Sequence, residues 1–355
     1  MSKPFVGYLK PVNGETLSSW LFRNSCSPHV RNVHSAFLKH CSDIAREETN
    51  GDLGNLVDAE SFRQLFPLPM QGLLQDVFPS SAPRQTGQAR LVRHERVVSH
   101  YCSRCLAEDV MALRSPARRC EWDDTHVCIC DRHPTLWLLQ PITARNSGRF
   151  EREWAAFSSH TSGGIFRAGR NLLAVHNTVE SRNPGEQIIC RLILRVQKWV
   201  RGAPEASSEL RLSRSGINFY LSFLLYRKFS MAKGGLAGWL VESHMKSGQA
   251  SISFRPPTKS EVLDNIGAAP ASQLAVAYLI IGISEGLFSA KEVASIAKAY
   301  RHLRYEFPLN RVAIADMARC LLVKNLNEFH RYACKDLPAA DVNRLSWLFY
   351  WATRG

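Results

Sequence analysis

Two pairs of metal-binding side chains, each separated by two residues, stand in the middle of the sequence. Cys102 and Cys105 form the first pair, and Cys130 and His133 repeat the spacing with an imidazole in the last place. A two-residue spacer lets a tight turn point both side chains at one ion, and four such ligands close a tetrahedral zinc shell of the structural kind. The sequence therefore predicts one structural Zn²⁺ ion held by these four residues.

The gap between the two pairs contains 24 residues, slightly more than the usual zinc-ribbon spacing. Cys120 and Cys128 lie inside the gap and are rival fourth ligands. The gap has room for a short helix and a strand, and the alternation of Thr125, Val127 and Ile129 predicts a strand that leads into the second pair. So small a module buries too little apolar area to fold alone, so we expect the metal to supply the missing stability.

Carboxylates beside the cysteines raise the alternative of a divalent-metal nuclease. Glu108 and Asp109 follow the first pair, and Asp123 and Asp124 lie in the gap. No nucleophile or base accompanies them, so we expect them to cap helices or bond to neighbouring amides. The sequence also lacks a glycine-rich phosphate-binding motif. We therefore predict that the protein is not an enzyme and has no catalytic residue.

The composition is that of a globular protein with a strong positive charge. Lys and Arg number 45 against 31 Asp and Glu, which gives a net charge of +14 over 355 residues. Such an excess favours a polyanionic partner, most often nucleic acid, although it also fits a solvated basic surface. No signal peptide or membrane span is predicted, so we expect a cytoplasmic protein. Among the ten cysteines, those outside the zinc module are expected to fill the core: Cys26, Cys41, Cys190, Cys320 and Cys334.

Several short helices are predicted within the first 80 residues. Leu17, Trp20 and Leu21 recur at helical spacing, with Thr16 as a candidate N-cap. Further short apolar runs follow, separated by prolines and loops. Such a bundle resembles a helix-turn-helix unit, which binds protein partners as readily as DNA.

The motifs together resemble the TniQ family of transposition-targeting proteins. The resemblance is carried by the run PxxGETLSSWLFR at 11–23, by YCSRCLAED at 101–109, by Trp122, and by CDRH at 130–133. The departures from the family pattern are Thr16, Ser103, Asp131 and Pro134. The resemblance implies the same four zinc ligands and a helix-turn-helix domain in residues 1–80.

The resemblance also implies a function. It indicates a non-enzymatic target-selection adaptor, a homodimer that links a crRNA-guided effector complex to the AAA+ transposition regulator, with DNA or RNA nearby. The length of the chain favours this CRISPR-associated type, because family members that read a fixed site are longer. The alternative is a sequence-specific DNA-binding protein that reads an attachment site directly.

The remainder of the chain is predicted to be helical. Pro184 begins an amphipathic helix with cations on its polar side, and Thr258 with Glu261 and Ser289 with Glu292 each fit a capping box. Pro338 begins a last helix whose aromatic residues are expected to lie in the core or in a subunit interface. The prediction is thus a mainly α protein: a helix-turn-helix domain at 1–80, a zinc-ribbon module at 91–145 and a helical region at 146–355.

Overall fold

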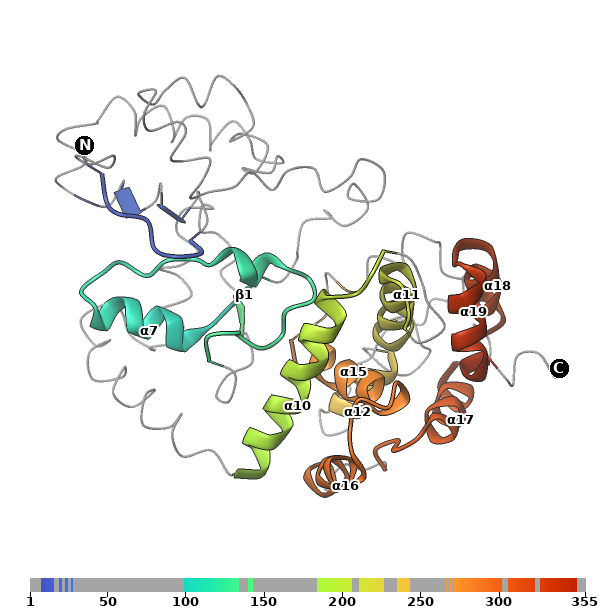
Figure 1. The fold of residues 1–355 in the computed structure, drawn as a ribbon. Coiled ribbons are helices and arrows are strands. Elements are labelled where there is room, and N and C mark those ends of the chain that lie inside the picture. Colours follow the sequence, from blue (N-terminus) through green and yellow to red (C-terminus); the bar gives the residue numbers. More distant parts are fainter. Residues whose placement is uncertain are drawn as a thin grey trace, which may run out of the picture. The chain divides into compact units, whose positions relative to one another are not determined.

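The computed structural model of the chain describes residues 8–15, 19–20, 23–24, 27, 99–133, 140–142, 184–205, 211–226, 235–242, 266, 269, 271–301, 306–322 and 326–349. Within these residues the chain is mainly helical, as predicted (Figure 1). Some predicted features fall outside them: most of the helix-turn-helix domain, the helix beginning at Thr258, and the last aromatic residues Tyr350 and Trp351. None of the described helices is both long and apolar enough to cross a membrane.

The chain forms two compact units. The first contains the described residues up to 27 together with 99–124, and the second contains the segment 125–141 and the C-terminal helices. In the first unit, strand β1 (Ser99–Tyr101) leads into helix α7 (Ser103–Met111), and a 3-10 helix, η2 (Cys120–Asp123), follows. Strand β1 pairs with β2 (Gln140–Ile142). An antiparallel bridge between Glu15 and Arg119 joins the N-terminal segment to the stretch before η2.

The second unit is a bundle of helices around α15. Its elements are α10 (Pro184–Arg201), α11 (Arg214–Leu225), α12 (Gly235–Glu242), α15 (Ala271–Ser284), α16 (Ala290–Ala299), α17 (Arg311–Leu322), α18 (Leu326–Asp336), α19 (Ala339–Leu345) and the 3-10 helix η4 (Ser346–Phe349). Helix α15, orange in Figure 1, contacts α10, α11, α12 and α17. The sequence of α15 is apolar on every side, which is why this helix occupies the centre.

Close packing around α15 depends on a small residue. A Cβ atom added at Gly282 would lie 2.2 Å from a ring carbon of Phe288 and 2.9 Å from a methyl of Val196. Only glycine therefore allows α15 and α10 to approach at this point. Helix α16 begins with a capping box, in which the Ser289 side chain accepts from the amide of Glu292 while the Glu292 carboxylate accepts from the amide of Ser289. Arg195 of α10 pairs with the same carboxylate. This box is one of the two that the sequence predicts.

Aromatic side chains pack where α11 meets α18 and η4. Phe223 of α11 and Tyr226, the residue after this helix, both meet Phe329 of α18 edge to face, with ring centroids 5.1 Å apart. Phe349 packs against Phe223. Phe349 and its neighbour Leu348 are buried, so the expected core position is confirmed for these two residues.

Two expectations about the chain are wrong in detail. Cys320 and Cys334 are exposed, whereas Cys190 is buried as predicted. Residues 125–128 form turns and irregular backbone instead of a strand. The reason is that the amides of Cys128 and Ile129 donate to a side chain, the Oε1 atom of Gln197, where a strand would need the backbone of a neighbour.

Candidate metal centre

The first pair of ligands stands where β1 passes into α7. Cys102 is the N-cap residue of α7, and Cys105 lies in the first turn of the helix. The amide of Leu106 donates to the carbonyl of Cys102 over 3.2 Å, which closes that turn. Residues three apart in a helical turn lie on one side, so both thiols face the same way. Both cysteines are fully buried.

A tight turn holds the second pair. The amide of His133 donates to the carbonyl of Cys130 over 3.1 Å, so Cys130 and His133 are the first and last residues of a four-residue turn. Cys130 is fully buried and His133 is 7% exposed. The Cys130 Sγ and His133 Nδ1 atoms lie 3.8 Å apart.

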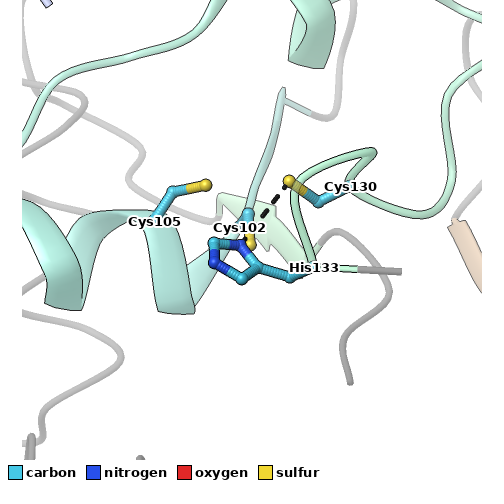
Figure 2. A group of neighbouring side chains, drawn as sticks. All are labelled: Cys102, Cys105, Cys130 and His133. Carbon is cyan, nitrogen blue, oxygen red and sulfur yellow. Dashed lines mark hydrogen bonds between the residues drawn. The ribbon is translucent and has the colours of Figure 1, made fainter. Parts of the chain in front are cut away.

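The four predicted ligands lie together. Their ligand atoms all lie within 4.8 Å of one another, and Figure 2 shows the thiols and the imidazole facing a common centre. In a tetrahedral zinc shell with Zn–S near 2.3 Å and Zn–N near 2.0 Å, ligand atoms are roughly 3.5–3.8 Å apart. The observed group is only slightly wider than this, so small side-chain rotations would close it around an ion.

The chemistry of the donors suits zinc. Three sulfurs and one imidazole form a donor set used by closed structural zinc sites, and soft thiolates disfavour calcium or magnesium. The buried group Cys102, Cys105, Cys130 and His133 can therefore hold a metal ion with its coordination sphere filled by protein. A filled sphere leaves no position for substrate or water.

The rival ligand Cys128 does not belong to this group. It is buried, its amide is directed at Gln197, and burial together with the nearby Cys190 raises the pKa of its thiol well above 9. The side chain of Cys120, the other rival, lies outside the described residues.

A buried carboxylate braces the helix that carries the first pair. Both oxygens of Asp109 accept from Nη2 of Arg119, over 2.8 and 2.9 Å, and one of them also accepts from the amide of Ala117 over 3.0 Å. Asp109 thus bonds to neighbouring groups, as predicted, and both of its carboxylate oxygens accept structural hydrogen bonds. The adjacent Glu108 is about half exposed and forms an ion pair with Arg104.

Hydrogen bonds inside the protein also engage the polar side chains of the N-terminal motif at residues 11–23. The carboxylate of Glu15 accepts from the amide of Val12, from Ser19 Oγ and from Arg23, whose guanidinium lies 2.5 Å away. Burial raises the pKa of Glu15 above 4.5, and the charge of Arg23 opposes that rise. The amide of Arg118 donates to Ser19 Oγ over 2.9 Å, which joins the motif to the segment before η2.

Tryptophan and asparagine complete this motif. Trp20 Nε1 donates to the carbonyl of Leu9 over 2.7 Å, and the amide of Leu9 donates to Asn24 Oδ1 over 2.8 Å. These side chains are hydrogen-bonded inside the protein, which indicates a structural role for the motif.

Sequence reasoning missed one residue of the site's surroundings. Gln197 is fully buried on α10, on the same side of the helix as Ile193 and Val200. Burying the side-chain amide of Gln197 within an apolar helical stripe costs free energy unless the amide is hydrogen-bonded. The sequence therefore indicated that Gln197 has a buried hydrogen-bond partner.

Comparison with known proteins places the metal group inside a family match. Residues 7–136 match the family model described as TniQ, a range that contains both the N-terminal motif and the four ligand residues. No curated protein and no solved structure matches the chain. The helices from α10 onward lie beyond the matched range.

Proposed function

We propose, on the premise that residues 7–136 of this chain belong to the TniQ family, that the protein is a non-enzymatic adaptor that selects targets for DNA transposition. In this role it links a crRNA-guided effector complex to the AAA+ transposition regulator. The observation that carries the proposal is the family match over the N-terminal motif and the metal group together.

The metal group supports an adaptor better than an enzyme. We propose that Cys102, Cys105, Cys130 and His133 bind one Zn²⁺ ion, whose binding energy stabilises the fold around it. Such an ion would supply rigidity, since four protein ligands leave no open coordination position. The commitment of Asp109 to Arg119 points the same way.

The positive charge of the chain supports the proposal that nucleic acid lies close to the protein. The net charge is +14, and exposed cations on the described surface of the second unit include Arg132, Arg191 and Lys198. We further propose a cytoplasmic homodimer, with a helix-turn-helix domain at 1–80, a zinc module at 91–145 and a helical region at 146–355.

A pull-down tests the adaptor role. The full chain is immobilised and offered the cognate crRNA-guided complex and the AAA+ regulator, with and without nuclease treatment. We expect both to be retained after nuclease treatment, because an adaptor binds them through protein surfaces. If the chain ignores both and instead shifts one DNA duplex at physiological salt, with steep salt dependence, the direct DNA reader replaces the adaptor.

A further inference from the structure

The segment that precedes the second pair of ligands is docked onto helix α10 by one side chain. The Oε1 atom of Gln197 accepts from the amides of Cys128 (2.8 Å) and Ile129 (3.0 Å), and its Nε2 atom donates to the carbonyl of Ile129 (2.9 Å). Only this orientation of the amide pairs donors with acceptors. Since Gln197 is fully buried, these bonds fix the backbone immediately before Cys130.

A second tether reaches the turn itself. Asp131 lies between the two ligands Cys130 and His133, and its Oδ2 atom accepts from Arg201 over 2.8 Å. Its other oxygen accepts from Gln197 Nε2 over 3.3 Å. Gln197 and Arg201 are four residues apart and therefore lie on one side of α10. This side contacts both Cys128–Ile129 and the Cys130–His133 turn.

The start of the segment is anchored as well. Tyr278 of α15 donates its hydroxyl to the carbonyl of His126 over 2.6 Å, and the His126 Nε2 atom lies 2.8 Å from Asn218 Oδ1 of α11. The segment 126–131 is therefore held at several points by helices of its own unit, with no strand pairing along residues 125–128.

We propose that Gln197 and Arg201 are positioning residues for the metal group: they hold the Cys130–His133 turn in the geometry that points both ligands at the ion. The inference rests on the proposed binding of zinc. Neither residue touches the ion; each acts through backbone or through Asp131. In metal sites, groups that orient the ligands typically contribute 10–100-fold to metal affinity.

Turn geometry provides an independent way to replace the tether. Asp131 occupies the second position of the turn, where proline is favoured because its ring already sets the required φ. If Arg201 acts by restraining the turn, Asp131→Pro keeps zinc release near the wild-type rate, although it removes the carboxylate that Arg201 binds. If the ion pair with Arg201 acts only by stabilising the fold, Asp131→Pro instead releases zinc as fast as Arg201→Ala.

The experiment measures zinc transfer from the full-length protein to an excess of a chromogenic chelator. The variants are Arg201→Ala, Gln197→Ala, Asp131→Pro and the double variant Arg201→Ala with Asp131→Pro. Arg195→Ala is the matched control, because Arg195 lies on the same helix but pairs with Glu292. Thermal unfolding is recorded alongside to separate zinc release from loss of the fold.

We expect zinc release about tenfold faster in Gln197→Ala and several-fold faster in Arg201→Ala, with Arg195→Ala unchanged. Asp131→Pro, alone or combined with Arg201→Ala, should release zinc at about the wild-type rate. Release at the wild-type rate in both Arg201→Ala and Gln197→Ala, or release from Asp131→Pro as fast as from Arg201→Ala, would overturn the inference. Wild-type protein without zinc would remove the proposed metal and this inference together, whereas intact zinc with unchanged variants removes only the inference.

Discussion

At the scale of single residues, a buried ionic side chain can have a structural role although its position in the sequence suggests catalysis. Asp109 follows Glu108 directly, and both stand beside two cysteines as nuclease carboxylates would. The structure separates them: Asp109 is almost fully buried against Arg119, while Glu108 is about half exposed. The two residues therefore allow a matched test of what the acidic pair contributes.

Asp109→Ala should destabilise the first unit strongly, because it leaves the buried guanidinium of Arg119 without its carboxylate. Breaking one side of a buried ion pair costs about 3–5 kcal/mol. Glu108→Ala is the control and should cost less than about 1 kcal/mol, since exposed pairs contribute little. Urea unfolding of both variants measures the difference. Equal effects would show that the Asp109–Arg119 pair is not the brace described above.

Single residues also differ in how much of their role the sequence predicts. The grouping of the four candidate ligands was predictable, because their spacing has a direct geometric meaning. Gln197 was not assigned a role, because its partners lie 66 to 69 residues earlier in the chain and nothing local names them. Polar satisfaction of a buried side chain is a tertiary property, so the sequence could signal only that a partner was needed.

At the scale of elements, helices followed local rules closely. Pro184 does begin α10, Ser289 and Glu292 do form a capping box, and Pro338 stands directly before α19. These signals involve residues within one turn of each other. The predicted strand is absent along residues 125–128, because alternation of side chains cannot reveal whether a neighbouring strand or a side-chain amide satisfies the backbone.

The capping box of α16 also serves as a helix–helix contact with a definite pH dependence. Glu292 accepts from Arg195 of α10 over 2.7 Å, and this hydrogen bond, with that from the Ser289 amide, lowers the pKa of Glu292 from 4.5 to about 2. A lowered pKa in the folded state means that the ionised carboxylate contributes stability above pH 4.5. That contribution is lost as the pH falls through about 2.

Glu292→Gln should therefore lower the free energy of unfolding near neutral pH by up to about 1 kcal/mol, the range for a solvent-screened pair. The gap between wild type and variant should stay constant down to pH 4.5, narrow below it, and vanish near pH 2. Urea unfolding across this pH range measures the gap. Glu306→Gln, which removes another exposed carboxylate, controls for the change in net charge. A gap that widens on acidification would contradict the assigned ion pair.

At the scale of the whole molecule, the metal group is predicted on two grounds. Spacing alone predicted a tetrahedral site, and the resemblance to TniQ implied the same ligands; the family match over 7–136 and the buried group then agree with both. The mainly α class was also predictable, since helical periodicity runs through the second half of the chain. The packing of helices around α15 was not, because it depends on contacts such as Gly282 against Phe288 that no local pattern encodes.

The central claim is that one zinc ion binds to Cys102, Cys105, Cys130 and His133. X-ray absorption at the zinc edge of the purified chain measures this directly, through the number and type of ligand atoms. We predict one zinc per chain, with three sulfurs near 2.3 Å and one nitrogen near 2.0 Å. Cys105→Ser should lose the ion and the fold around it, whereas Cys190→Ser, a buried cysteine outside the group, should retain both. A chain without zinc, or a shell with a different ligand set, would contradict the account.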